Sequence, residues 1–222
     1  YIDLYQVHWP ERPITTLGRS RYSWIPDTPA LAPIEETLEA LGEQVHAGKI
    51  RHIGVANETP WGVMRYLAAA RESGMPRIVT VQNSYSLLDR YFELGLAEVA
   101  MREQVGLLAY SPLAGGMLTG KYVGAPRPIP GTRSSLSPGF SARFTDKKMR
   151  ATAAYTDLAR QHGLEPAAMA LAFVRQQPFT TSVLMAASSP AQLELNLRGI
   201  ELQLSKELLK QINAIHDDLP TP

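Results

Sequence analysis

The sequence contains no cysteine among its 222 residues. That absence excludes a disulfide framework, a thiolate metal site and a cysteine nucleophile. An excess of charge of either sign is also missing, because 22 lysines and arginines balance 21 aspartates and glutamates. We therefore expect neither nucleic acid nor an anionic membrane surface as a partner.

Long apolar runs are missing as well. No stretch approaches the roughly 20 residues that a membrane-spanning helix needs, and the first residues do not resemble a signal peptide. We therefore expect a cytoplasmic protein. With 45% hydrophobic residues, the chain is long enough to enclose one substantial core, and we expect a single domain over residues 1–222.

Strand-like and helix-like patterns alternate along the chain. Runs rich in β-branched and aromatic residues predict strands over residues 1–7, 50–56, 77–82, 105–111 and 180–186. Apolar residues at helical spacing, together with capping signals, predict helices over 34–47, 60–73 and 92–103, two helices divided at Gly163 and Pro166, and helices that begin after Ser189 and Ser205.

Two of these helix starts have a clear chemical signature. Thr59 is the predicted N-cap, because its hydroxyl can accept a hydrogen bond from a backbone amide of the first helical turn. Pro60 suits the first helical position. Ser189, Pro190 and Gln192 form an S-x-x-Q capping box with proline at the same position.

Strictly alternating units with apolar strands predict a parallel sheet, either doubly wound or closed into a (βα)8 barrel. The glycine fingerprint G-x-G-x-x-G after a strand is absent, which argues against a Rossmann fold. A complete barrel typically takes about 250 residues and has eight strands. Because five strands are recognisable, a barrel would be incomplete here, and a five-stranded doubly wound sheet is the competing architecture.

Ligands bind beyond the carboxyl ends of the strands in both architectures. The residues at or just beyond the ends of the predicted strands are polar or aromatic: His8 with Trp9, Asn57 with Glu58, Gln82 with Asn83, Tyr110 with Ser111, and Ser188 with Ser189. A proline-rich loop runs from Trp9 to about Pro33. Loops of that length are usually functional.

Five segments of the chain resemble the aldo-keto reductases. They are YIDLYQVHWP, GKIRHIGVANET, VQNSYSLLDR, YSPLAGGMLTGKY and AASSPAQLELNL, in that order. The similarity is to the Tas-like bacterial branch of the family, near the potassium-channel β subunits. It implies a (βα)8 TIM barrel, of which this chain would carry strands 4 to 8 and a C-terminal helix. It also implies NADPH-dependent reduction of aldehydes or ketones by hydride transfer.

The family uses an aspartate, a tyrosine, a lysine and a histidine for catalysis. His8 matches the histidine, and its implied role is to hydrogen-bond and polarise the substrate carbonyl. None of the nine tyrosines precedes a glycine, as the catalytic tyrosine of the family does. The aspartate, tyrosine and lysine belong to the first strands of the family's barrel. We therefore expect the chain alone to lack the proton donor, to be inactive, and to aggregate or dimerise through open sheet edges.

The resemblance also implies residues for the nicotinamide end of NADPH. Asn57 and Gln82 match side chains that hold the carboxamide, since an amide both donates and accepts hydrogen bonds. Tyr110 matches an aromatic residue that stacks on the ring, and a plain core aromatic is the alternative. Ala56 stands where the family usually has serine, so one hydrogen bond to the carboxamide is lost.

The resemblance also implies residues that contact the phosphates of NADPH. The segment along the pyrophosphate is Ser111, Pro112, Leu113 and Gly115. Lys121 and Arg133 flank a loop that resembles the family's lid over the cofactor, and Arg143 is a weaker candidate. Taken singly, such residues are more commonly solvated surface charges.

At the adenine end, Ser188, Gln192 and Asn196 match residues around the 2′-phosphate and adenine, at a helix N-terminus that suits an anion. Gln192 has an alternative role in the capping box, where it would bind the amide of the N-cap residue. Ala186 and Leu195 replace the family's glycine and acidic residue, which predicts either a reduced affinity at the adenine end or a relaxed preference for NADPH over NADH.

Two functional hypotheses follow. The first is an NADPH-dependent enzyme that acts on a small carbonyl substrate, with Trp9 at the substrate pocket. The second is a nucleotide-binding, non-reducing regulatory protein like a potassium-channel β subunit, in which an asparagine commonly stands in place of His8. The histidine favours the enzyme. The other histidines have no carboxylate spacing typical of a metal site, so we predict no metal.

Overall fold

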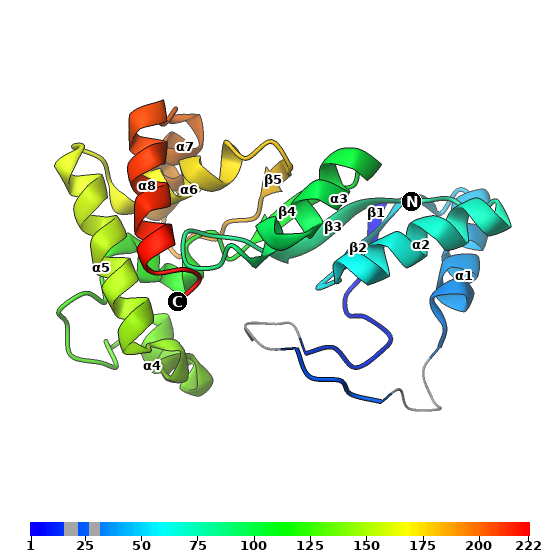
Figure 1. Cartoon of the computed structure of the whole chain (residues 1–222), viewed down its shortest axis with the longest axis horizontal. Coiled ribbons are helices and arrows are strands. Elements are labelled where there is room, and N and C mark those ends of the chain that lie inside the picture. Colours follow the sequence, from blue (N-terminus) through cyan, green and yellow to red (C-terminus); the bar gives the residue numbers. More distant parts are fainter. Residues whose placement is uncertain (16–21, 27–31) are drawn as a thin grey trace. The chain divides into compact units, whose positions relative to one another are not determined.

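The computed structural model describes residues 1–15, 22–26 and 32–222. The chain divides into two compact units, which are described separately below (Figure 1). The first consists of Tyr1–Asn83 and Phe92–Leu108, and the second of Ser84–Tyr91 and Ala109–Pro222. Parts of the predicted loop from Trp9 to Pro33, residues 16–21 and 27–31, lie outside the described residues.

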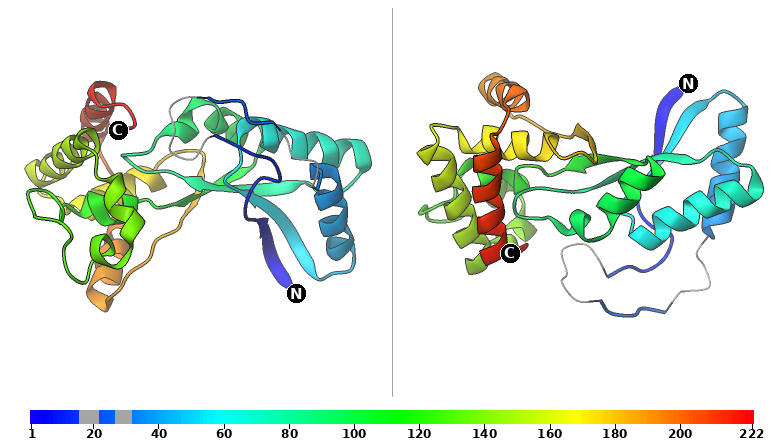
Figure 2. Two further views of the ribbon diagram at one scale, coloured as in Figure 1. Left: turned by 90° about the horizontal axis from the view of Figure 1, so that it is seen from below. Right: turned by 45° about the horizontal axis from the view of Figure 1, so that its top comes forward.

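The strands form a five-stranded sheet in the order β1-β2-β3-β4-β5. Their bounds are Ile2–Val7 (β1), Ile50–Ala56 (β2), Ile78–Ser84 (β3), Gly106–Tyr110 (β4) and Thr180–Val183 (β5). Strand β2 pairs in parallel with β1 and with β3, and β1 and β2 lie side by side in both views of Figure 2. The predicted α/β fold with a parallel sheet is confirmed. Because each strand neighbours the next along the chain, the order has no reversal of the kind that defines a doubly wound sheet.

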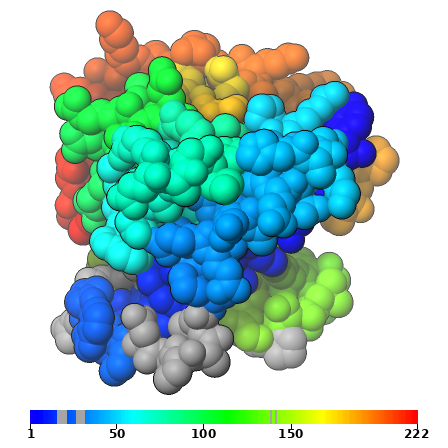
Figure 3. Space-filling model, turned by 90° about the vertical axis from the view of Figure 1, so that its right-hand side faces the viewer, coloured from blue at the N-terminus to red at the C-terminus, as the bar shows by residue number. Residues whose placement is uncertain are grey.

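The described residues of the first unit include the α-helices α1 (Ile34–His46), α2 (Pro60–Ser73) and α3 (Leu96–Glu103). The atoms of α1 and α2, blue to cyan in Figure 3, lie against one another. The apolar side chains of β2, β3 and α2 make the core of this unit, and Ile53, Val63 and Ile78 are fully buried.

The predicted signature at the start of α2 is confirmed. The Thr59 side chain accepts a hydrogen bond from the Gly62 amide at 3.1 Å, and Pro60 occupies the first helical turn. Gly74 ends the helix in the left-handed conformation with φ 70°. Both ends of α2 are therefore fixed by local chemistry.

The expectation of one continuous helix over residues 92–103 is wrong. A 3-10 turn, η1 (Tyr91–Leu94), precedes α3, and Gly95 stands between them with extended backbone at φ 167°. A Cβ atom at Gly95 would lie 3.3 Å from the Pro60 ring. The break thus accompanies a close tertiary contact, which helical periodicity does not report.

Helices dominate the second unit. Its α-helices are α4 (Arg133–Leu136), α5 (Asp146–Gln161), α6 (Pro166–Arg175), α7 (Pro190–Glu201) and α8 (Lys206–Asp218), and its 3-10 segments are η2 (Ala114–Thr119) and η3 (Pro138–Arg143). The predicted division at Gly163 and Pro166 is confirmed, since it separates α5 from α6. Every residue of α6 up to Val174 is buried. Among the residues that the structure describes, no helix has both the length and the apolar character needed to cross a bilayer.

The capping box at α7 is confirmed in one half and wrong in the other. The Ser189 side chain accepts from the Gln192 amide at 3.3 Å, as predicted. The Gln192 Oε1 atom, however, accepts from the backbone amide and the hydroxyl of Ser188, each at 3.0 Å, and not from the Ser189 amide. Both Ser188 donors converge on the one carbonyl oxygen that glutamine offers.

Helices α6 and α7 approach closely at Gly199, where a Cβ atom would lie 2.7 Å from the Ala168 Cα. We expect Gly199→Ala to lower the free energy of unfolding by about 1–3 kcal/mol through overpacking, despite the better helix propensity of alanine. Chemical denaturation measures this change. Gly139→Ala is the control, because nothing lies within 4 Å of a Cβ there, and it should change stability by less than about 0.5 kcal/mol. Equal effects at both positions would contradict the close helix contact.

Candidate functional site

Three of the predicted site residues meet at the carboxyl ends of β1, β2 and β3. The Asn57 side chain donates its Nδ2 to the backbone carbonyl of His8 at 2.8 Å. The backbone amide of Asn57 donates to the carbonyl of Gln82 at 2.9 Å. The parallel register, in which Ala56 pairs with Gln82, brings these strand ends level. The structure therefore places His8, Asn57 and Gln82 together.

Asn57 has an unusual backbone. Its φ is 57°, in the left-handed region that asparagine tolerates better than most residues, and it is buried. The chain leaves β2 in a sharp turn at this point, and the Asn57 amide group crosses to the end of β1. The link between β1 and β2 therefore depends both on the side-chain amide of Asn57 and on its left-handed backbone.

The neighbouring residue, Glu58, is held through its backbone by the side-chain amide of Asn83, which was not among the predicted site residues. Asn83 Oδ1 accepts from the Glu58 amide at 3.1 Å, and Asn83 Nδ2 donates to the Glu58 carbonyl at 2.8 Å. Since Asn83 follows Gln82, this reciprocal pair ties the end of β3 to the turn after β2. The sequence offered a polar residue near the end of a predicted strand, but it gave no sign that Glu58 would be the partner of Asn83.

The Glu58 carboxylate is almost completely buried, with 1% of its side chain exposed, and it pairs with Arg12 at 2.8 Å. Burial raises the pKa of Glu58, while the hydrogen bond and charge of Arg12 lower it. Sequence reasoning missed Arg12 altogether. A buried carboxylate requires a cation, but nothing in the local sequence tells which of many arginines supplies it.

A second missed residue supports Gln82. The Gln82 Nε2 atom donates to Gln6 Oε1 at 2.9 Å, so two glutamines from β3 and β1 form a side-chain pair. Because Nε2 is the donor in this pair, the side-chain oxygen Oε1 of Gln82 is the atom of its amide that can accept a hydrogen bond. The pairing fixes the Gln82 side chain beside the end of β1.

The His8 and Trp9 side chains are both exposed. Their rings stack with centroids 5.9 Å apart and an interplanar angle of 20°. Trp9 has 51% of its surface accessible. Both predicted residues therefore present their rings where a ligand can reach them.

In the second unit, β4 ends at Tyr110, and the chain then turns through left-handed conformations at Ser111, Ala114 and Gly115. Gly115 was predicted to admit a phosphate chain. A Cβ there would collide with the Phe140 ring, so the glycine makes room for that aromatic side chain. The closest neighbour of Gly115 is thus a ring of its own unit. Pro112 and Leu113 lie within the same turn.

Lys121 and Arg133 both lie over aromatic rings of one cluster, formed by Tyr122, Phe140 and Phe144. The Lys121 Nζ is 5.2 Å from the Tyr122 centroid, and the Arg133 guanidinium carbon is 5.6 Å from that of Phe140. Arg127, which sequence reasoning did not select, lies 4.7 Å from the Phe144 ring. The cluster therefore gathers three cations through cation–π contacts.

Of the three residues predicted for the adenine end, Ser188 precedes α7, and Gln192 and Asn196 lie on it. Ser188 and Gln192 bind one another, as described above. Asn196 is buried and donates to the Ala186 carbonyl at 3.5 Å. The structure brings these residues close together, and the side-chain oxygen of Gln192 accepts hydrogen bonds from Ser188.

Near the end of β4 lies a group of titratable side chains. Asp89 accepts a hydrogen bond from the Ser84 hydroxyl at 2.6 Å. Burial raises the pKa of Asp89, and the Ser84 hydrogen bond opposes that shift. Burial also raises the pKa of Tyr110, with a further contribution from the Asp89 charge, and burial lowers the pKa of Lys148.

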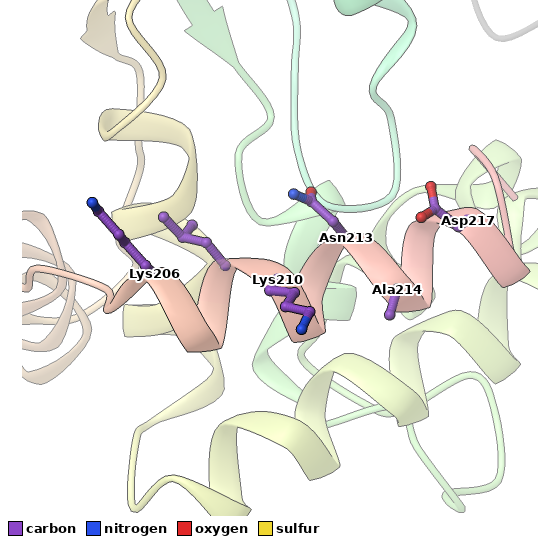
Figure 4. A pocket seen from close by; sticks show the side chains of 6 residues that line it. Lys206, Lys210, Asn213, Ala214 and Asp217 are labelled. Atoms are coloured by element: carbon purple, nitrogen blue, oxygen red, sulfur yellow. The ribbon is translucent and has the colours of Figure 1, made fainter.

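An open hollow of about 480 Å³ lies elsewhere in the second unit, along α8 (Figure 4). Its lining residues are Lys206, Leu209, Lys210, Asn213, Ala214 and Asp217. None of the predicted site residues lines it. Within the described ranges, no group of three or more histidine, cysteine, aspartate or glutamate residues is arranged to hold a metal ion.

Comparison with known proteins places this geometry in context. Residues 1–217 match the model of the Aldo/keto reductase family. Protein tas of Escherichia coli (strain K12) is 52% identical over 216 residues, which cover 97% of this chain and 62% of that protein. An aldo-keto reductase of Babesia bovis is 34% identical over 229 residues, covering 97% of this chain and 80% of that protein.

A third relative has a more specific printed activity. The L-glyceraldehyde 3-phosphate reductase of Escherichia coli (strain K12) is 32% identical over 189 residues, covering 82% of this chain and 54% of that enzyme. The chain thus spans 62% of the length of Protein tas and 54% of the length of this reductase.

The raised pKa of Asp89 predicts how this residue changes the stability of the fold with pH. Its pKa in the folded protein lies above the ordinary value of 3.8, so ionised Asp89 stabilises the fold less than neutral Asp89 does. Stability from this residue is therefore present at pH below 3.8 and is lost as pH rises through the raised pKa. Asp89→Asn keeps an acceptor for Ser84 and never ionises.

We expect the melting temperature of Asp89→Asn, relative to wild type, to increase as pH rises from below 3.8 toward neutrality. Thermal melts across that range measure it. The control Asp157→Asn removes an exposed carboxylate, 61% accessible, and should produce a small offset. A relative melting temperature for Asp89→Asn that is constant with pH, or that falls, would contradict the account.

Proposed function

Because the chain belongs to the aldo/keto reductase family, we propose that it is part of an NADPH-dependent oxidoreductase that reduces small aldehydes or ketones to alcohols. The observation that supports this most is the junction of His8, Asn57 and Gln82 at adjacent strand ends. His8, whose side chain is exposed, and two residues with side-chain amides thus come from neighbouring strand ends. This combination suits a carbonyl substrate next to a carboxamide-bearing cofactor.

The residues present fit the nicotinamide end of NADPH. Asn57 and Gln82 carry amides able to hold a carboxamide, and their partners in the chain, the His8 carbonyl and Gln6, fix how each amide is turned. When bound, the cofactor supplies a hydride. Among the chain's own groups, His8 would donate a hydrogen bond to the substrate carbonyl oxygen and so orient and polarise it. Trp9, stacked on His8, would form an apolar wall of the substrate pocket.

We propose the second unit for the rest of the cofactor. The turn Ser111, Pro112, Leu113 and Gly115 would lie along the pyrophosphate with Tyr110 against the nicotinamide. Lys121 and Arg133 would supply positive charge for the phosphates, and their shared aromatic cluster supports this by gathering cations. Ser188, Gln192 and Asn196 would bind the adenosine end, and the replacements Ala186 and Leu195 would weaken the discrimination between NADPH and NADH.

For the architecture, we propose that the five strands are strands 4 to 8 of a (βα)8 barrel in one domain, followed by a C-terminal helix. The strand order without reversal supports this. So does the exposure of apolar residues on β1, where Ile2 is 48% and Tyr5 42% accessible, because further strands would cover them. The family's catalytic tyrosine, aspartate and lysine would then lie outside this chain, which would be inactive alone. We also propose a cytoplasmic location.

The regulatory alternative, a nucleotide-binding protein without turnover, is less well supported. His8 provides a hydrogen-bond donor of the kind that carbonyl reduction uses, and the L-glyceraldehyde 3-phosphate reductase is an enzyme by its printed name. A binding protein requires the amides but has no use for a group that polarises a substrate.

The test uses the gene product that carries this sequence. We expect it to oxidise NADPH when a nitrobenzaldehyde is added, followed by the absorbance of the reduced cofactor. His8→Ala should lower kcat by about a hundredfold or more, because a preorganised hydrogen bond to the developing oxyanion is lost. Asn57→Ala should weaken cofactor binding by about tenfold. Binding of NADPH without turnover would favour the regulatory alternative, and absence of binding would contradict both.

A further inference from the structure

Arg12 makes contacts that a surface arginine in a loop does not need. Its Nη2 lies 2.8 Å from Glu58 Oε2 and its Nη1 lies 3.2 Å from Glu58 Oε1, which is a two-point pairing of guanidinium and carboxylate. Arg12 also donates to the Thr59 hydroxyl at 3.0 Å and to Glu11 at 2.8 Å. The Trp61 ring lies 4.6 Å from its guanidinium carbon.

These contacts close a ring of interactions around the candidate site. Arg12 lies four residues after His8 in the same loop. Glu58 directly follows Asn57, whose side chain donates to the His8 carbonyl. The loop is therefore attached to the turn after β2 at two points, once at His8 and once at Arg12. Two attachments fix the orientation of a short segment, whereas one leaves it free to pivot.

The local chain is built around this ion pair. A Cβ at Gly62 would collide with the Glu58 carboxylate and would lie 2.5 Å from the Arg12 Nη2, so the first turn of α2 leaves room for both partners of the ion pair. The Thr59 amide donates to Glu58 Oε2 at 2.8 Å, which adds to the hydrogen bonds that the buried carboxylate receives. Both oxygens of Glu58 are thereby bound, as burial of a charge requires.

We propose that Arg12 is a positioning residue, which holds the loop after β1 against the Asn57–Glu58 turn and so directs His8 at the substrate carbonyl. This inference rests on the proposed function. Arg12 itself does not touch the reacting atoms. Its role is specific because a buried ion pair adds little net stability compared with an apolar pair of similar volume, but it imposes one geometry.

The competing explanation is that Arg12 only stabilises the fold. The two are separated by the double variant Arg12→Met with Glu58→Met, which removes both charges and leaves side chains that can pack. Its melting temperature should match wild type or exceed it. Its kcat should nevertheless stay about ten- to a hundredfold low, since misplacement of a catalytic group by a fraction of an ångström to an ångström has effects of that size.

The single variant Arg12→Ala separates kcat from KM, and a purely structural role of Arg12 would not predict such a separation. We expect kcat to fall about ten- to a hundredfold while the KM for the aldehyde changes by less than about threefold, because the lost interaction acts in the transition state. Millimolar guanidinium ion should restore part of kcat by occupying the site beside Glu58. Methylammonium, which lacks the planar fork of donors, should restore less.

Arg102→Ala is the matched control. Arg102 pairs with Glu98 at 2.7 Å on the exposed surface of α3, and its loss should leave kcat and its response to guanidinium unchanged. Wild-type turnover combined with an unchanged kcat in Arg12→Ala, or with full kcat in the double variant, would overturn this inference and leave the proposed function intact. Absence of turnover in wild type would overturn the proposed function itself.

Discussion

The hydrogen bond from the Asn57 side chain to the His8 carbonyl is the interaction on which the candidate site depends. It joins the ends of two parallel strands, β1 and β2, which a long loop and a helix separate in the sequence. The left-handed backbone of Asn57 makes the bond possible, because it turns the chain away from β2 while the side chain reaches back to β1. Asn83 and Arg12 then hold the next residue, Glu58, by its backbone and its carboxylate. The site is thus a turn fixed from both sides.

Local chemistry made part of this structure predictable. The parallel strands followed from apolar runs, and the cap at Thr59 followed from one hydroxyl and one proline, because each signal lies within a few residues of the feature it specifies. The break at Gly95 and the true partner of Gln192 were not predictable in that way. The first accompanies an approach to Pro60, and the second depends on which of two adjacent amides the folded backbone presents.

The candidate site shows the same division. That His8, Asn57 and Gln82 would lie near one another followed from the geometry of parallel strands, since each lies at or near the carboxyl end of a strand. Arg12 was missed because its partner is 46 residues away, and Gln6 because a glutamine on a strand gives no sign of its neighbour. Gly115 was predicted to lie along the pyrophosphate, and its packing against Phe140 could not be read from the sequence. Residue type indicates what a group can bind, whereas packing determines what it meets.

The central claim is that these strand ends hold the nicotinamide of NADPH beside His8. The most direct measurement is a crystal structure of the gene product with NADP⁺ bound. The account predicts that the carboxamide lies within hydrogen-bond distance of the Asn57 and Gln82 side chains, with the His8 imidazole facing the same ring. A nucleotide bound away from both amides, for instance in the hollow along α8, would contradict it.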